Sequence, residues 1–581
     1  MIKRLSALLL LALAGISLSA QEADFRIMSF NMERGDLSVA KGWGWNVRKP
    51  AALAMLEFRR PDIMGVQECN SIQRDDVLER MPDYDYIGVA VSGAADDYPV
   101  TSANLIFYDR NKFELLDHGE FWYAFEPDSA GAFTWIARKP RNATWGRFRH
   151  KATGREFVYV NNHLQNGTDA VINRSMSIIQ LLAKMRELNP EGLPMLYTGD
   201  LNSKGIEGYY APLNQEMREA ALSCPVTDLG TTLGVYKTKT EGGRIDHIYY
   251  SGALEGLAFG VDREDYEGLA FVSDHFPVYA DMRFTPEAPE KGQYWFDLKP
   301  SEGDCSVKAG TWNLFSTAER DHRGAPSWKS VRGNVADVIA SLGTDLLGLQ
   351  EITDPMARDL PKLLKKTCGK QYRLWMNFSD ENPESVGREA VGLLYNTERF
   401  SISRQRVSWI TSSPYEAQAK AWNDGYWAVL SAVFTDKATG KRFFAITGKM
   451  TRGENSVKYE GAVLKKIEKE LNPEELPCIL MVDMNATPKN QVWISLLNYW
   501  TDCYSLVYPF PDTRFSTRVP KNGFYEGNTP QDWSSKFDVI GISRHVEKSV
   551  IVTEHTVHRE IADLAPVPSD HCPVTATLVF K

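Results

Sequence analysis

The stretch Leu193-Pro-Met-Leu-Tyr-Thr-Gly-Asp200-Leu-Asn202 decides the fold class, because a short apolar run stops abruptly at polar residues. Such a run is typical of a buried β-strand. Phe157-Val-Tyr-Val-Asn-Asn162 has the same character, and between the two runs residues 173–188 carry apolar side chains at helical spacing. Short strands that alternate with helices indicate an α/β or α+β class, with sheets packed together and helices outside.

The deciding stretch occurs twice, since it recurs as Leu476-Pro-Cys-Ile-Leu-Met-Val-Asp483-Met-Asn485. Four further pairs of segments recur in the same order: Arg26–Asn31 with Val307–Asn313, Pro61–Glu68 with Thr344–Glu351, Arg244–Ile248 with Lys536–Ile540, and Ser273–Val278 with Ser569–Val574. A long ordered repeat of this kind indicates two tandem copies of one domain. We predict a signal peptide at 1–20, a first domain at 21–285, a proline-containing linker at 286–303 and a second domain at 304–581.

The start of the chain has the composition of an export signal. Lys3 and Arg4 precede an apolar run from Leu5 to Ile16, and small residues follow up to Ala20. This order predicts a cleavable secretory signal, and hence a periplasmic or extracellular protein. The alternative is an uncleaved membrane anchor, although the apolar run is short for a span of about 20 residues.

Composition argues against a broad nucleic-acid surface and against a cysteine zinc site, but it does not exclude a nuclease with a locally positive cleft. The net charge of −9 argues against a broad basic surface for nucleic acid. The seven cysteines are scattered and form no C-x-x-C pair, which argues against a zinc site built from cysteines. We expect most of them to be buried as small apolar side chains.

Polar side chains follow several of the apolar runs in the first copy: Asn31, Glu68, His163, Asp200, Asn202, Asp246, Asp274 and His275. Active sites are assembled at strand ends and in the loops after them. Each residue alone has an ordinary explanation, such as a turn for Asp200 and Asn202 or a structural role for His163. Together, carboxylates, amides and two histidines suit a hard divalent cation and a phosphate group.

This ordered series resembles the endonuclease/exonuclease/phosphatase superfamily, over essentially all of Asp24 to Arg283. The resemblance implies a four-layer α/β/β/α sandwich, present here in two tandem copies. It also implies hydrolysis of a phosphodiester or phosphomonoester by metal-assisted attack of water, with Mg²⁺ or Mn²⁺ as the cofactor. Its implied metal ligands are Glu68, Asn31 and Asp274.

The resemblance also implies catalytic roles. His275 acts as acid or base on the scissile phosphate, and Asp246 orients its ring. Asp200 positions or deprotonates the attacking water, with Asn202 holding that geometry. His163 and Arg141 stabilise charge on the phosphoryl oxygens.

The second copy keeps part of this set: Asn313, Glu351, Asp483, Asn485, Asp538, Asp570 and His571. Lys449 stands in the place of His163. Matching Trp145 to Trp427 puts Asn423 in the place of Arg141. Arg174, just inside the helix after the His163 loop, is expected to support the first site, and counting forward from Lys449 puts Glu460 in its place. Either this copy is degenerate and supports the first, or it acts on a different substrate with Lys449 supplying charge.

The second copy is also rich in tryptophan: Trp409, Trp422, Trp427, Trp493, Trp500 and Trp533. We expect most of these in the core, although an aromatic cluster near the cleft would be able to stack on a sugar or a base.

The substrate stays open among nucleic acid, a phospholipid headgroup and a small phosphate ester. We expect a monomer with no stable protein partner. The alternative to an enzyme is a non-catalytic binding or scaffold protein, which would have no need of the donor set in the first copy.

Overall fold

The computed structural model describes residues 22–93, 102–133, 137–167, 170–203, 210–287, 299–368, 372–380, 382, 384, 388–417, 427–451, 457–486, 491–507, 516–519, 536–544 and 549–581. The predicted signal peptide lies outside these residues, as do Asn423, Trp422, Trp533 and most of the predicted linker. The predicted domain boundaries therefore stay predictions.

The first half of the chain forms two sheets, with strand orders β10-β12-β13-β1-β2-β4-β3 and β5-β6-β7-β8-β11-β9. The strands of the first sheet are β1 (Phe25–Asn31), β2 (Ile63–Cys69), β3 (Tyr84–Ile87), β4 (Ala103–Asp109), β10 (Val226–Thr227), β12 (Leu254–Val261) and β13 (Val278–Phe284). Those of the second are β5 (Phe113–Trp122), β6 (Asn142–His150), β7 (Glu156–His163), β8 (Met195–Asp200), β9 (Arg218–Glu219) and β11 (Asp246–Ser251).

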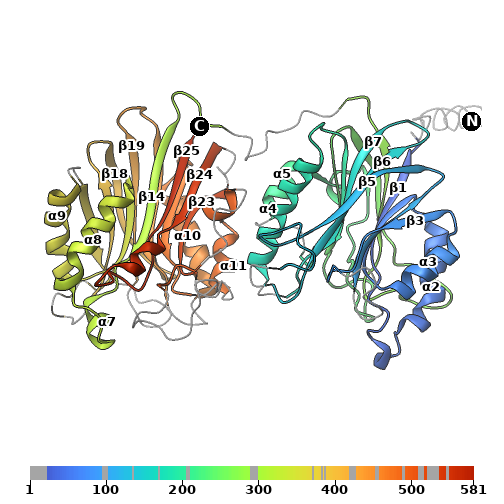
Figure 1. Ribbon diagram of the computed structural model, residues 1–581, viewed down its shortest axis with the longest axis horizontal. Coiled ribbons are helices and arrows are strands. Elements are labelled where there is room, and N and C mark those ends of the chain that lie inside the picture. Colours follow the sequence, from blue (N-terminus) through green and yellow to red (C-terminus); the bar gives the residue numbers. More distant parts are fainter. Residues whose placement is uncertain are drawn as a thin grey trace, which may run out of the picture.

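Helices cover the outer faces of both sheets (Figure 1). They are η1 (Val39–Lys41), α2 (Trp45–Arg59) and α3 (Ser71–Arg80) beside the first sheet, and α4 (Val171–Leu188), α5 (Ala211–Glu216) and α6 (Ala220–Ser223), which come later in the chain. Ile27, Ile63, Tyr159 and Leu196 belong to one buried cluster that joins the two sheets face to face. All six residues of β8 are buried, because a sheet covers one face and α4 the other.

The second half repeats this plan, with sheets β16-β17-β15-β14-β25-β24 and β18-β19-β20-β21-β23-β22. The first contains β14 (Cys305–Asn313), β15 (Leu346–Ile352), β16 (Tyr372–Phe378), β17 (Ala390–Asn396), β24 (Val550–Val557) and β25 (Val574–Phe580). The second contains β18 (Phe400–Trp409), β19 (Ala428–Asp436), β20 (Arg442–Lys449), β21 (Cys478–Asp483), β22 (Trp500–Asp502) and β23 (Asp538–Ser543). Its helices are α7 (Thr317–His322), α8 (Trp328–Leu342), α9 (Asp354–Cys368), α10 (Val457–Leu471), α11 (Gln491–Leu497), η4 (Cys503–Leu506) and η7 (Arg559–Asp563).

Two tandem four-layer α/β/β/α sandwiches are therefore present, and the predicted fold class is confirmed. The helix predicted at 173–188 is α4, and α10 is its counterpart. The two halves touch where α4 meets α11 and η4, and they share one buried cluster there (Figure 1).

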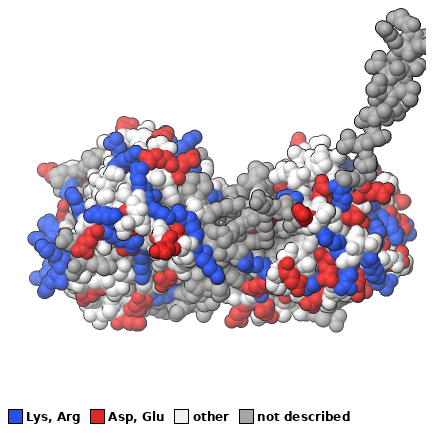
Figure 2. Space-filling view, turned by 90° about the horizontal axis from the view of Figure 1, so that it is seen from above, with Lys and Arg blue, Asp and Glu red and all other residues white. Residues whose placement is uncertain are grey.

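Three further observations concern the surface and the cysteines. Acidic and basic side chains are interspersed on the face shown in Figure 2. This mixture agrees with the net charge, which argues against a broad basic surface. All seven cysteines are free, and six are buried, so the burial predicted for most of them is confirmed. In the described part of the chain no helix has both the length and the apolar character needed to cross a bilayer.

Candidate active site

Parallel strand pairs bring the predicted residues to one edge of the first sandwich. Asn31 at the end of β1 lies beside Gln67 of β2, and His163 at the end of β7 lies beside Asp200 of β8. Asp246 at the start of β11 pairs with Asp200 from the other side. The ends of strands from both sheets therefore converge, as the sequence predicted.

Two of these residues have left-handed backbone conformations, which non-glycine residues adopt at a cost of about 1–3 kcal/mol. Glu68 has φ 57° at a bulge in the pairing of β2 with β4, and Asn202 has φ 50°. Glu351 and Asn485 have the same φ values in the second half. Strain of this kind persists where the surrounding structure holds a side chain in a required position.

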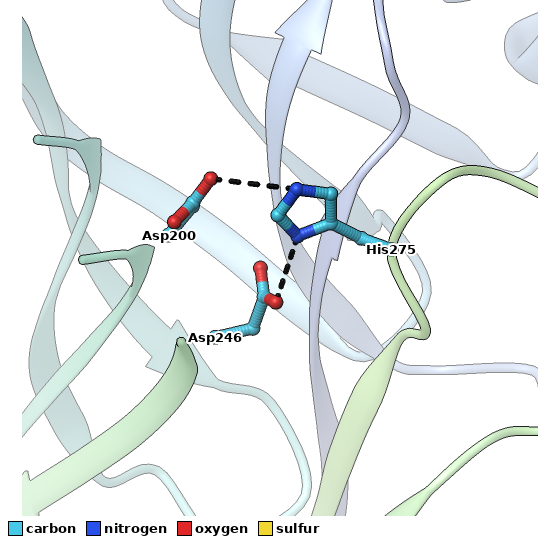
Figure 3. A group of neighbouring side chains, drawn as sticks. All are labelled: Asp200, Asp246 and His275. Atoms are coloured by element: carbon cyan, nitrogen blue, oxygen red, sulfur yellow. Dashed lines mark hydrogen bonds and ion pairs between the residues drawn. The ribbon is translucent and has the colours of Figure 1, made fainter. Parts of the chain in front are cut away.

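Asp200, Asp246 and His275 form a buried cluster (Figure 3). His275 Nδ1 lies 2.9 Å from Asp246 Oδ2, and His275 Nε2 lies 3.8 Å from Asp200 Oδ2. The histidine ring therefore joins the two carboxylates, with Asp246 fixing the orientation of the ring.

The charges of this cluster act strongly on one another. Burial lowers the pKa of His275, but the charges of Asp246 and Asp200 raise it by more. The pKa of His275 therefore lies well above its ordinary value. Burial raises the pKa of the Asp200 carboxyl to about 7, with His275 opposing and Asp246 adding to the effect. An acid and a base with such values are suited to proton transfer near neutral pH.

Amide groups hold Asp200 in place. Asn31 Nδ2 donates to Asp200 Oδ2 at 2.9 Å, and the Asn202 backbone N–H donates to Asp200 Oδ1 at 2.8 Å. His163 Nε2 lies 2.9 Å from Asn202 Nδ2 and 3.3 Å from Asp200 Oδ2. Burial, together with the positive charges of Arg141 and Lys139, holds the pKa of His163 well below its ordinary value, so its ring is neutral.

Arg141 is buried beside these groups. Burial lowers the pKa of its guanidinium to about 10, against the opposing carboxylates of Glu68 and Asp200, so it is charged at neutral pH. Its Nε is buried, and no group in the described residues accepts a hydrogen bond from it. An unsatisfied cationic donor of this kind is suited to an anionic ligand.

The residues predicted as metal ligands form an acidic group that fits a divalent cation. Glu68 Oε2 accepts a long hydrogen bond from Arg34 N at 3.4 Å. Burial raises the pKa of Asp274, and the nearby carboxylates of Glu33 and Glu68 raise it further. Crowded carboxylates that raise one another's pKa are relieved by a bound cation, and oxygen ligands are those that Mg²⁺ prefers.

Asp200, Asp246 and His275 also lie close enough together to bind a metal ion. A protonated imidazole is not a ligand, however, and the raised pKa of His275 together with its bond to Asp246 favours that form. The carboxylates on the Glu68 side of the site therefore fit a cation better than this cluster does.

Three residues of the site were missed from the sequence. Lys139 acts on the pKa of His163, and Glu33 acts on that of Asp274. Tyr236 OH donates to Glu33 from a loop in which Tyr236 has φ 59°, and this loop has no recognisable sequence pattern. Lys139 lies two residues before Arg141, and Glu33 two after Asn31, so proximity to a predicted residue was the available signal.

In the second half the acid–base cluster is preserved. His571 Nδ1 lies 2.8 Å from Asp538 Oδ2, and Asn313 Nδ2 donates to Asp483 Oδ2 at 2.8 Å. The Asn485 backbone N–H donates to Asp483 at 2.8 Å, as its counterpart does in the first half.

The predicted metal side of the second half is occupied by protein cations instead. Lys449 Nζ lies 2.6 Å from Glu351 Oε1 and 3.1 Å from Glu389 Oε2. Arg518 Nη1 lies 2.5 Å from Asp570 Oδ2. Glu351 and Asp570, the carboxylates equivalent to Glu68 and Asp274, are therefore already paired with protein cations.

The predicted equivalence of Asn423 with Arg141 is wrong. Tyr123 N donates to the carbonyl of Arg141, and the matching bond runs from Ile410 N to the carbonyl of Trp427. Trp427 therefore occupies the place of Arg141. The count failed at its starting point, because it paired Trp145 with Trp427 by residue type. Strand pairing instead makes Asn142 at the start of β6 correspond to Ala428 at the start of β19.

Arg174 has a supporting role rather than a place among the reacting groups. Its Nη1 donates to the carbonyls of Gln165 and Gly167, both at 2.9 Å. Glu460 stands at the matching position and accepts from the backbone N–H of Thr451 at 3.0 Å. Each side chain thus binds the loop that follows the third strand of its sheet.

Known proteins are similar to part of this chain. Residues 28–275 match the model of the Endonuclease/Exonuclease/phosphatase family. The chain is similar to a solved mannosyl-6-phosphatase of Bacteroides thetaiotaomicron VPI-5482, with 30% identity over 45% of this chain and 100% of that one, at a TM-score of 0.42. It is also similar to a family protein of Bacteroides vulgatus, with 28% identity over 45% of this chain and 98% of that one, at a TM-score of 0.41. A comparison with curated proteins returned no match.

Proposed function

Because the chain belongs to the endonuclease/exonuclease/phosphatase family, we propose that its first half is an exported, divalent-metal-dependent phosphoesterase. The observation that carries the proposal is the convergence of one acid–base cluster, one acidic cation site and one unsatisfied arginine at a single edge of the first sandwich. Export rests on the N-terminal sequence, with its basic start, apolar run and small residues.

Each residue has a role that follows from its contacts. Arg141 and the neutral His163 bind the phosphoryl oxygens and stabilise the charge that develops on them. Asp200, with a pKa of about 7, accepts the proton of the attacking water, while Asn31 and Asn202 hold its oxygens.

His275 completes the acid–base pair. Its raised pKa makes the ring an imidazolium that donates to the phosphate, and Asp246 keeps Nε2 directed at the site. Glu68, Asp274 and Asn31 would hold Mg²⁺ or Mn²⁺. The cation, when bound, supplies Lewis-acid polarisation of the phosphoryl group.

The test is hydrolysis by the purified protein of plasmid DNA, sphingomyelin, bis(p-nitrophenyl) phosphate and mannose 6-phosphate, with and without chelator. These four probes represent the nucleic acids, phospholipid headgroups and small phosphate esters among which the substrate stays open. We expect turnover of at least one substrate that chelator abolishes and added Mg²⁺ or Mn²⁺ restores. Turnover that survives chelator would overturn the proposal.

A His275→Ala variant separates an enzyme from a binding protein. Loss of turnover with retained folding supports the enzyme. A variant as active as the parent would favour the non-catalytic alternative, since the histidine would then have no chemical task.

A further inference from the structure

We propose that the second half carries a binding pocket for a neutral monosaccharide, built at the place where the first half has its phosphate side. The pocket is a cavity of about 240 Å³ at the ends of β15, β17 and β20, lined by Glu351, Glu389, Lys449, Trp427, Ser379 and Asp380 among others. At about 30 Å³ per water molecule, this volume holds roughly eight waters, which is room for one small molecule.

The lining differs from the first half at three matched positions. Lys449 replaces His163 and Trp427 replaces Arg141. Glu389 stands where the first half has Ser102. Each directly precedes an alanine that pairs just past a bulge: Ala390 with Ile352 of β15, and Ala103 with Cys69 of β2. The changes add an ammonium, an indole and a carboxylate, and they remove the buried guanidinium.

These changes make the pocket unsuited to a phosphate. The described residues that line it include the carboxylates of Glu351 and Glu389 against the one ammonium of Lys449, while the third carboxylate, that of Asp380, interacts with the Arg388 guanidinium. That ammonium is already engaged by two of the carboxylates. An anionic ligand would therefore meet net negative charge, and no guanidinium among these described lining residues.

A cationic ligand is disfavoured for a second reason. Lys449 Nζ lies 5.6 Å from the centre of the Trp427 ring, so this aromatic ring already has a cation beside it. A divalent metal ion at Glu351 would have to displace the Lys449 ammonium at 2.6 Å. Burial lowers the pKa of Lys449, but Glu351 and Glu389 raise it above its ordinary value, so the ammonium keeps its charge.

A neutral sugar fits the polar groups and the aromatic ring that line the pocket. The carboxylate of Glu389 accepts hydrogen bonds from hydroxyl groups, and the Ser379 hydroxyl is able to donate to a ring or hydroxyl oxygen. The half-buried Trp427 ring supplies apolar area for the C–H face of a sugar. An aromatic wall with a few convergent polar groups is the usual composition of a small-molecule site.

The experiment is isothermal titration calorimetry of the full-length protein with D-glucose, D-galactose, D-mannose and N-acetylglucosamine. Inorganic phosphate and tetramethylammonium serve as the anionic and cationic probes. We expect at least one neutral sugar to bind with a Kd of about 1 mM or tighter, and to bind more tightly than either ion. The Glu68→Gln protein should bind the sugar with the parent's affinity, because Glu68 lies in the first half and the pocket in the second. The hydrolysis assay and the sugar titration therefore test the two proposals separately.

Variants locate the binding. Trp427→Ala should weaken the sugar at least tenfold, Trp427→Phe should retain most of the affinity, and the exposed Tyr415→Ala serves as the aromatic control in the same half. If circular dichroism shows that Trp427→Ala is unfolded, Glu389→Gln should weaken binding at least fivefold instead. Absence of binding by all four sugars, equal affinity in the folded pocket variant and the parent, or tighter binding of phosphate or tetramethylammonium would each overturn the proposal.

Discussion

Glu460 in α10 is a buried carboxylic acid whose replacement by glutamine should stabilise the protein. Its side chain is fully buried, and Oε1 accepts hydrogen bonds from the backbone and hydroxyl of Thr451. No donor in the described part of the chain reaches Oε2. Burial therefore raises the pKa of Glu460 from 4.5 to about 7, although both bonds from Thr451 lower it.

The size and sign of the effect follow from this pKa. The folded state binds the proton of Glu460 more tightly than the unfolded state, so stability falls as the pH rises from about 4.5 through 7. Each pKa unit corresponds to about 1.4 kcal/mol, so the loss reaches about 3 kcal/mol at pH 8 and only about 1 kcal/mol at pH 5. Glu460→Gln keeps the acceptor for Thr451 and removes the ionisation, so it should regain most of this loss at pH 8.

The assay is urea unfolding followed by tryptophan fluorescence, for the parent and the variant at pH 5 and pH 8. Glu468→Gln is the matched control, because Glu468 is a buried glutamate of the same helix whose carboxylate pairs with Lys465 at 3.0 Å. We expect Glu460→Gln to gain stability mainly at pH 8 and Glu468→Gln to gain none. A Glu460→Gln protein that is no more stable than the parent at pH 8, or equally stabilised at both pH values, would refute the reasoning.

Four further predictions concern the two sites. Glu68→Gln should lower kcat/KM about 100-fold and abolish the rise in Tm that Mn²⁺ gives, because it removes a metal carboxylate; an unchanged Tm response would count against the cation site. Arg141→Met should lower kcat about 100- to 1,000-fold, whereas a steady-state rate within threefold of the parent would remove this arginine from the site. Below pH 7 the Asp200 carboxyl is protonated and unable to accept a proton, because burial raises its pKa to about 7, so kcat/KM should rise with pH through about 7; a profile flat from pH 5 to pH 8 would contradict this. Lys449→Met should lower the free energy of unfolding by about 3–5 kcal/mol, since it leaves a buried carboxylate unpaired, and chemical denaturation showing no loss would mean that the ion pair is not formed.

Much of the first site could be predicted from the sequence because its residues stand directly after short apolar runs, which are recognisable as strands. Short apolar runs that stop at Asn31, Glu68, His163 and Asp200 specify strands, and the order of those strands specifies the sandwich. The repeat then predicted the second sandwich and its own Asp483 cluster, and both are present.

Other features depend on groups that come together from distant segments. The ion pair of Lys449 with Glu351 and Glu389 joins the ends of three strands, and the linear sequence contains no pattern for it. Glu389 was not singled out for that reason.

The sequence by itself determined the fold class and the duplication, because both depend on local periodicity and on the order of segments, and the family resemblance implied the residues of the first acid–base cluster. Only the tertiary structure decided that Trp427, and not Asn423, stands where Arg141 stands. It also decided that protein cations neutralise the second copy's carboxylates. The physical reason is that strand pairing fixes which residues correspond, whereas two residues of the same type, such as Trp145 and Trp427, need not occupy the same strand position.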